Sequence, residues 1–300
     1  MGKWLILAGI LALQEAVVSE RQYSGDVIAH TVSAGESLVS LGARFGVEPR
    51  TLATDNGLAA VTAISAGQRL VIDNRHVVPK HPAGGIVINV PQRMLFVFVD
   101  DRLVAAYPVA VGRPDWRTPL GEFVVSNKET DPTWDVPASI QEEMSARGGR
   151  IPPHVPPGPN NPLGDRWIGV SGLGFGIHGT NQPSSIYRFA THGCIRLHPD
   201  DARSLFDVVW IGMPIQIVYQ PILAARLDPN HVMVEVHADV YRRAGAPEVK
   251  IADLMRELSV DVADLKALHE VLRHKHGRGI VLECRARHLT PAETEQPVSD

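Results

Sequence analysis

The feature that most constrains the fold is a series of closely spaced segments in which apolar and polar residues alternate. They are Ile86–Val90, Met94–Val99, Leu103–Val111 and Phe123–Asn127. Alternation with a period of two is typical of strands that bury one face. Asp100 and Asp101 lie between the second and third segments and predict a hairpin turn there. Short strands with few helices between them predict a mainly β fold, a sandwich or a barrel-like sheet.

One short stretch contains the residue types that nucleophilic catalysis needs. It runs from His178 to Arg196 and contains Cys194, one of the two cysteines of the chain. A cysteine attacks a carbonyl as its thiolate, so it needs a base or a positive charge within reach. His178, His192 and Arg196 are the candidates for that role. The stretch therefore predicts an active site.

Two strings within this stretch resemble the signature of a known enzyme family. Residues 178–181 read HGTN, and residues 191–197 read THGCIRL. Together they resemble the L,D-transpeptidase catalytic domain of the YkuD type. The string TPLGEF at residues 118–123 also recurs in these domains. The resemblance implies a sandwich-like or barrel-like catalytic domain at about residues 84–220.

The resemblance also implies the roles of individual residues. Cys194 would be the nucleophile that forms a thioester, and His178 would be its general base. The backbone carbonyl of Gly179 would orient the imidazole of His178. The backbone N–H groups of His192, Gly193 and Cys194 are the expected oxyanion donors, because glycine lets the backbone approach a substrate closely.

Three neighbouring residues are expected to support the site. We expect Thr191 to tighten the loop by hydrogen bonding. Arg196 could bind a substrate carboxylate, or it could hold the loop in place. His192 could line the pocket, or it could be the base in place of His178.

A metal site is not expected, and no cofactor is expected. The possible zinc ligands near the nucleophile are His178, His192, Cys194 and His198. Zinc ligands usually come in compact pairs such as CxxC or HxxxH, and the stretch contains neither pair. Nine histidines elsewhere in the chain are expected at the surface: His76, His81, His154, His231, His237, His269, His274, His276 and His288.

A second resemblance lies near the N-terminus, at residues 29–73. The pattern there predicts a β-α-α-β order: a strand at His30–Val32, a helix from Leu38 to Gly46, a helix from Pro49 and a strand at Arg69–Ile72. The strings TVSAGESL, DNGL and AGQRLVI are similar to a LysM module. LysM modules commonly bind glycan that contains N-acetylglucosamine. Val39 and His30 stand where the family often has aromatic residues, so a purely structural role is the alternative.

Residues 128–165 contain a long segment that is rich in proline. Ser139–Arg147 predicts a short helix, whereas Ile151–Gly164 can form neither a helix nor a central strand. Its string PPGPNNPLG resembles a segment of the periplasmic subfamily that combines LysM with this catalytic domain. Because long loops in compact domains are often functional, we expect a wall or lid over the cleft. A rigid surface connector is the alternative.

The pattern of the C-terminal region, residues 221–288, predicts a small α+β appendage in which no catalytic motif is recognised. The expected elements are a strand near His231–Ala238, helices near Ile251–Ser259 and Val262–His274, and a strand at Ile280–Cys284. Cys284 is expected as a free thiol packed in this last strand. Residues 289–300 are polar and expected to be disordered. Residues 73–84 between the first two modules are polar, which predicts a linker.

The N-terminus predicts export. Lys3 precedes the apolar run Trp4–Leu13, and small residues follow, as in a Sec-type signal peptide at residues 1–19. A short buried or tethering helix is the alternative.

No later apolar run is long enough to span a bilayer. The formal net charge of −4 disfavours nucleic acid as a partner, because phosphate binding needs a basic face. The expected location is the periplasm.

The resemblance to L,D-transpeptidases implies the reaction and the partners. The donor would be the stem tetrapeptide of peptidoglycan, which loses its terminal D-alanine. The acyl group would pass to an amine of another stem or of an outer-membrane lipoprotein. The resemblance also implies that carbapenems acylate Cys194. One alternative is a carboxypeptidase or amidase in which water resolves the thioester, and another is a non-enzymatic wall-binding protein that acts through LysM.

Overall fold

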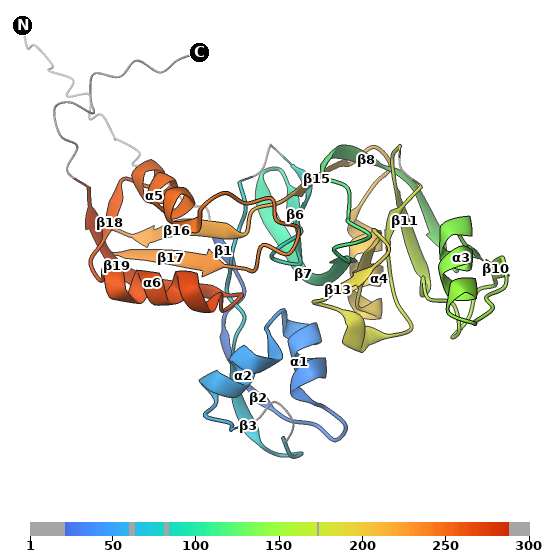
Figure 1. Ribbon diagram of the computed structural model, residues 1–300, viewed down its shortest axis with the longest axis horizontal. Coiled ribbons are helices and arrows are strands. Elements are labelled where there is room, and N and C mark those ends of the chain that lie inside the picture. The colour runs from blue at the N-terminus through green and yellow to red at the C-terminus, as the bar shows by residue number, and fades with distance from the viewer. Residues whose placement is uncertain (1–21, 60–63, 81–83, 173, 288–300) are drawn as a thin grey trace, which may run out of the picture.

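A computed structural model describes residues 22–59, 64–80, 84–172 and 174–287. The predicted signal peptide and the polar tail at residues 289–300 therefore lie outside the described residues. The fold is mainly β and consists of three parts, which Figure 1 shows in order along the colour bar. None of the described helices has the length and apolar character needed to cross a membrane.

The N-terminal module has the predicted β-α-α-β order. Its elements are β2 Val27–Thr31, α1 Leu38–Phe45, α2 Pro49–Asp55 and β3 Arg69–Asp73, with β2 and β3 antiparallel. Ser37 caps α1 by accepting a hydrogen bond from the Ser40 N–H, and Gly46 ends it with φ 71°. The module has its own apolar core, which includes Leu52 and Ile72.

The central domain is a nine-stranded sheet in the order β13-β7-β14-β12-β11-β8-β15-β5-β6, and β6 also pairs with β7. This extra pairing closes the sheet, so the barrel-like prediction is confirmed. The strands are β5 Gly85–Asn89, β6 Met94–Val99, β7 Arg102–Gly112, β8 Gly121–Thr130, β11 Arg166–Val170, β12 Gly176–His178, β13 Phe189–Thr191, β14 Ile195–Leu197 and β15 Pro214–Val218. Asp100 and Asp101 form the predicted turn, with φ of 48° and 60°.

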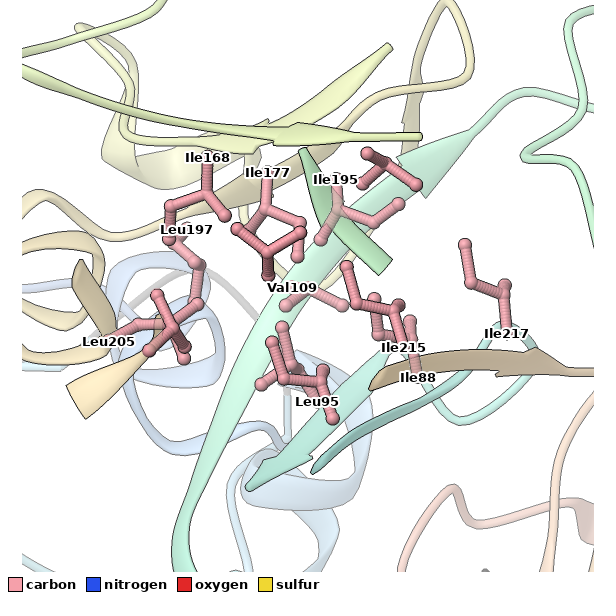
Figure 2. Packing of buried hydrophobic residues seen from close by; sticks show 14 of the residues in the cluster. Ile88, Leu95, Val109, Ile168, Ile177, Ile195, Leu197, Leu205, Ile215 and Ile217 are labelled. Carbon is pink, nitrogen blue, oxygen red and sulfur yellow. The ribbon is translucent and has the colours of Figure 1, made fainter. Parts of the chain in front are cut away.

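The core of this domain determines which way the catalytic stretch faces. Figure 2 shows apolar side chains from several strands and from α4 (Pro199–Val208) converging inside the sheet. Ile177 of β12 and Ile195 of β14 are fully buried in this core and lie opposite each other in parallel strands. Since side chains alternate along a strand, His178, Cys194 and Arg196 project from the other face.

The proline-rich segment contains little regular structure. Its elements are β9 Trp134–Asp135, α3 Ala138–Ala146 and β10 His154–Val155, and β9 pairs only with β10. The helix has the predicted position, but it buries no side chain of its own. Its attachment to the domain therefore depends on polar contacts rather than on an apolar face.

The C-terminal part is an antiparallel sheet with two helices. It contains β16 Ile222–Asp228, β17 His231–Val236, α5 Pro247–Glu257, β18 Val260–Val262, α6 Leu265–His274 and β19 Gly279–Ala286. The sequence pattern missed β16. The helix expected from Val262 begins at Leu265 instead, because Val260–Val262 pairs with β19 and Asp264 caps α6. Cys284 is a free thiol and 6% exposed in β19, as predicted.

Two histidines expected at the surface are buried where the three parts meet. His76 belongs to β4, His76–Val77, which pairs with β1, Tyr23–Ser24. The prediction of a linker at residues 73–84 is therefore wrong at this strand. His76 is 0% exposed and His237 is 3% exposed. Both rings hydrogen bond to the carboxylate of Glu235, each at 2.7 Å. Hydrogen bonds to the buried carboxylate offset the desolvation cost of burying these polar rings.

Candidate active site

A cavity of about 650 Å³ opens on the face of the sheet that carries the catalytic stretch. Five of the predicted site residues line it, namely His178, Thr191, His192, Cys194 and Arg196. The proline-rich segment supplies much of the opposite side, including Trp134, Ile140 and Leu163. This segment is therefore a wall of the cavity and not a remote connector.

Parallel pairing of β12 with β14 brings the two motifs together. His178 lies opposite Arg196 in the ladder, and Cys194 comes directly before β14. His178 and Cys194 are thus diagonal neighbours on one face of adjacent strands, a relation in which long side chains are within reach of each other. Sheet pairing holds His178, whereas Cys194 lies at the end of the loop that leads into β14.

His178 is buried, 5% exposed, and its tautomer follows from its contacts. The ring Nδ1–H donates to the Gly179 carbonyl oxygen at 2.7 Å, which leaves Nε2 as the unprotonated nitrogen. The Trp167 ring is stacked on the imidazole, with centroids 5.9 Å apart and planes at 20°. Burial, followed by the charge of Arg196, lowers the pKa of His178 to about 3. The ring is therefore neutral and able to accept a proton.

Cys194 is partly buried in the cavity, and burial raises the pKa of its thiol above the ordinary value. A hydrogen bond from the Gly176 backbone and the positive charge of Arg196 oppose that shift. The resting pair is therefore a neutral thiol beside a neutral imidazole. A nucleophilic thiol in this arrangement would have to lose its proton as it attacks.

The sequence reasoning missed Gly176 as part of the site. A Cβ atom there would lie 2.6 Å from Cζ2 of Trp167, so a side chain at this position would displace the ring stacked on His178. Its position two residues before the histidine of HGTN is the signal that could have identified it.

The loop before the nucleophile is held by threonine hydroxyls. Thr191 Oγ1 donates to the Cys194 carbonyl oxygen at 2.6 Å, which agrees with the expected tightening of the loop. The Gly193 N–H, one of the expected oxyanion donors, donates to Thr191 Oγ1 over 3.2 Å. Gly193 has φ 108°, a conformation that residues with a Cβ rarely adopt. Glycine is therefore required at this turn.

Arg196 has features of both roles considered for it. Its Nη1 donates to Ser185 Oγ at 2.9 Å, which ties β14 to the turn Pro183–Ser185. Its guanidinium also borders the cavity, and its Nε has no hydrogen-bond partner among the described residues. The charge that holds this turn is thus also available to a substrate carboxylate in the cavity.

His192 is engaged by a carboxylate from the wall. Its Nε2–H donates to Glu143 Oε2, and its ring meets Trp116 edge to face, with centroids 4.7 Å apart. Glu143 also contacts Arg113 at 3.1 Å and Arg147 at 2.7 Å. The hydrogen bond from His192, together with Arg113, holds the pKa of Glu143 below its usual range. Because Nε2 is occupied, the geometry favours His178 over His192 as the base.

Glu143→Gln should loosen the wall formed by α3. The helix buries no side chain, and Glu143 connects it to two residues outside it, His192 of the catalytic loop and Arg113 after β7. We expect KM for the donor substrate to rise about 3-fold to 10-fold, with kcat within about twofold, because α3 would hold its place in the cavity wall in a smaller fraction of molecules before substrate binds. Steady-state kinetics will measure this.

Glu142→Gln is the matched control for that change. Glu142 lies on the same helix, carries the same charge and is exposed. Its KM should equal that of the wild type. An equal rise in KM in both variants would indicate a general effect of charge on α3 and would contradict the specific attachment.

One group of possible metal ligands converges among the described residues, and it lies outside this cavity. It consists of His76, Glu235 and His237. The ring nitrogens lie 2.7 Å from the same carboxylate oxygen, Oε1 of Glu235. Ligands around a tetrahedral zinc would be about 3.3 Å apart for metal–ligand distances of about 2.0–2.1 Å. The contacts are those of hydrogen bonds with a proton between the atoms, so we assign no metal to this group.

Comparisons with known protein families agree with both resemblances. The YkuD family, the L,D-transpeptidase catalytic domain, matches residues 83–217. The LysM domain family matches residues 30–73.

The chain is also similar to proteins named as probable or putative L,D-transpeptidases. The chain is 32% identical to the probable L,D-transpeptidase ErfK/SrfK of Escherichia coli K12, over 69% of this chain and 67% of that protein. It is 31% identical to the putative L,D-transpeptidase YkuD of Bacillus licheniformis, over 64% of this chain and 99% of that protein. Among solved structures, L,D-transpeptidase 3 from Mycobacterium tuberculosis matches at 19% identity with a TM-score of 0.36, over 50% of this chain and 67% of that one. The chain belongs to the L,D-transpeptidase family with a YkuD-type catalytic domain.

Proposed function

We propose that this protein is a cysteine-dependent L,D-transpeptidase that acts on peptidoglycan. The observation that carries the proposal is the convergence of Cys194 with the oriented, unprotonated Nε2 of His178 on one cavity. Membership of the L,D-transpeptidase family supports the same reaction. The catalytic unit would be residues 84–220, preceded by a LysM module at 29–73 and followed by an α+β part at 221–288.

The reaction has two acyl-transfer steps. Cys194 Sγ attacks the carbonyl carbon of the third stem residue while Nε2 of His178 takes the thiol proton. The carbon–nitrogen bond to D-alanine then breaks, and the imidazolium returns the proton to the leaving amine. A second amine attacks the thioester, gives its proton to His178 and releases the thiol. The Gly179 carbonyl would stabilise the imidazolium that forms between the steps.

Oxyanion stabilisation would come from the backbone before the nucleophile. The N–H groups of His192, Gly193 and Cys194 are the proposed donors. The Gly193 N–H would exchange its 3.2 Å bond to Thr191 for the shorter bond that an oxyanion offers. Arg196 would bind a carboxylate of the stem peptide, while Ser185 holds its guanidinium at the edge of the cavity.

The partners follow from the two modules. We propose that the LysM module binds the glycan of peptidoglycan and that the cavity receives the stem tetrapeptide. The acceptor would be an amine of another stem or of an outer-membrane lipoprotein. The protein would act in the periplasm after export. Carbapenems would acylate Cys194 in the same cavity.

Muropeptide products distinguish this proposal from its alternatives. The full-length mature protein is incubated with tetrapeptide muropeptides, and the products are identified by mass spectrometry. A transpeptidase gives cross-linked dimers and free D-alanine. A carboxypeptidase that uses water as acceptor gives tripeptide monomers. Unchanged substrate would contradict the enzyme assignment and favour a wall-binding protein that acts through LysM.

The kcat/KM of the enzyme should vary little with pH between about pH 5 and pH 9. Burial lowers the pKa of His178 to about 3, so the base becomes protonated, and the rate falls, only as the pH approaches that value. Burial raises the pKa of the Cys194 thiol, so the catalytic proton is lost only at alkaline pH. Initial rates across this range will test the profile. A steep change between about pH 6 and pH 8 would instead indicate a thiolate–imidazolium pair.

A further inference from the structure

The C-terminal part of the chain inserts one side chain into the catalytic domain. Tyr241 follows β17 and lies beyond residues 83–217, the range that the YkuD family matches. Its side chain is 1% exposed and belongs to the apolar core of the nine-stranded sheet. We propose that Tyr241 is a positioning residue that sets the direction of the Cys194 backbone N–H. This inference rests on the proposed function, because it concerns the oxyanion donors of that reaction.

Two aromatic rings and a backbone hydrogen bond hold Tyr241 in place. It stacks on Tyr219, with centroids 5.3 Å apart and planes at 17°, and it meets Phe189 edge to face at 5.9 Å. The Tyr241 N–H donates to the Tyr219 hydroxyl at 2.7 Å, and that hydroxyl donates to Asp239 Oδ1, also at 2.7 Å. The phenol therefore enters the catalytic domain in one orientation.

The Tyr241 hydroxyl binds two backbone groups beside the catalytic loop. It donates to the Gly112 carbonyl oxygen at 2.7 Å and accepts from the Thr118 N–H at 3.1 Å. Gly112 ends β7, and Thr118 is 1% exposed at the start of the TPLGEF string. One buried hydroxyl thus fixes the position of Thr118 relative to β7.

Thr118 passes this constraint to the nucleophile. Its hydroxyl accepts from the Gly112 N–H at 2.8 Å and donates to the Gly193 carbonyl oxygen at 3.0 Å. The Gly193 C=O and the Cys194 N–H belong to the same planar peptide group, and in a trans peptide they point in opposite directions. Holding the carbonyl therefore orients the N–H. This N–H is one of the proposed oxyanion donors, and its direction matters most in the transition state.

Tyr241→Phe tests the inference because it keeps the ring and removes only the hydroxyl. Gly112 and Thr118 then each lose a partner, and Thr118 is less firmly held against Gly193. We expect kcat for acyl transfer to fall about 10-fold, with KM within about twofold. Complete loss of an oxyanion donor typically costs about 100-fold to 1,000-fold, and a misaligned donor costs less.

Two reactions of the Cys194 sulfur, acylation and alkylation, distinguish a misplaced oxyanion donor from a general loss of thiol reactivity. Thioester formation develops an oxyanion, whereas alkylation by iodoacetamide displaces iodide from a saturated carbon and forms none. In Tyr241→Phe, the rate of acylation of Cys194 by tetrapeptide should fall about 10-fold. The rate of alkylation of Cys194, measured by peptide mass mapping, should stay within about twofold of the wild-type rate. Equal slowing of both reactions, or no change in acylation, would overturn the inference.

Tyr107→Phe provides the control, since Tyr107 is a partly buried tyrosine on β7 of the same domain. It should leave both reactions unchanged. The Cys194 amide resonance in a nitrogen-15 spectrum gives a reading that needs no turnover. It should shift in Tyr241→Phe and not in Tyr107→Phe, and an unmoved resonance would overturn the inference. If wild type formed no thioester, the proposed function would fail, while this spectrum would still test the role of Tyr241.

Discussion

Cys194→Ser should abolish formation of muropeptide dimers, with kcat lowered by at least about 10,000-fold. His178 is a neutral imidazole with a pKa near 3, a weak base that can receive a proton from a thiol far more readily than from an alcohol. The remaining hydroxyl would be held in the same place but would stay protonated. Mass spectrometry of the muropeptide products will measure the loss.

The other cysteine provides the control for this variant. Cys284 is buried in the C-terminal sheet, in an apolar cluster separate from the core that Cys194 contacts. Intact mass after exposure to imipenem should show one adduct in Cys284→Ser and none in Cys194→Ser. Dimers produced by the Cys194→Ser protein at a rate near that of wild type would refute a cysteine mechanism.

Glu235→Gln should lower the free energy of unfolding by about 3–5 kcal/mol, the usual cost of removing one partner from a buried ion pair. The Glu235 carboxylate is 0% exposed and accepts hydrogen bonds from two histidine rings, the Val77 N–H and the Gln92 amide. A glutamine at this position has a single acceptor oxygen and an NH₂ group that would face other donors.

This site also links the three parts of the protein. His76 Nδ1 hydrogen bonds to Glu235, and its Nε2 hydrogen bonds to the Gly46 carbonyl oxygen at 2.8 Å. Gly46 ends a helix of the LysM module, Gln92 belongs to the sheet domain, and Glu235 lies in β17. Loss of the carboxylate should therefore loosen all three contacts together, and differential scanning calorimetry will report a lower transition temperature.

The same network predicts how stability depends on pH. Burial alone would raise the pKa of Glu235, but the charge of His76 and the hydrogen bonds from both histidine rings overcome it and lower this pKa to about 2, from 4.5 in a free chain. A lowered carboxyl pKa stabilises the fold above about pH 4.5, and this contribution is lost as the pH falls toward 2. Burial also lowers the pKa of His237, so the unfolded chain takes up that proton first and stability declines below about pH 6.5.

Glu283→Gln is the matched control for the charge change. Glu283 lies on β19, pairs with β17 in the same sheet and is exposed. It should leave the transition temperature unchanged, and it should keep the acid sensitivity of wild type between about pH 4.5 and pH 2. A Glu235→Gln protein as stable as the Glu283→Gln protein would contradict the role assigned to the buried carboxylate.

The sequence by itself determined the elements that depend on neighbouring residues. Alternation at residues 86–111 predicted β5, β6 and β7, and the aspartates at 100 and 101 predicted the turn between the last two strands. Gly46 and Pro49 predicted where α1 ends and α2 begins. Spacing and turn chemistry act over a few residues, so a linear pattern contains this information.

The proposed catalytic residues could also be identified from the sequence, because they lie close together in it. The HGTN and THGCIRL strings contain the base, its orienting carbonyl and the nucleophile. The structure added the neutral state of the resting pair, since burial is the largest cause of both the lowered pKa of His178 and the raised pKa of Cys194. Local sequence does not determine how much water a side chain loses.

Only the tertiary structure decided which distant residues support the site and join the three parts. His76 meets a carboxylate 159 positions away, and Tyr241 meets Thr118 over 123 positions. A polar side chain is buried only where folding supplies a partner, and here the partners come from other parts of the chain. No local pattern distinguishes such a histidine or tyrosine from a surface one, so the contacts that hold the Cys194 loop became visible only once the chain was folded.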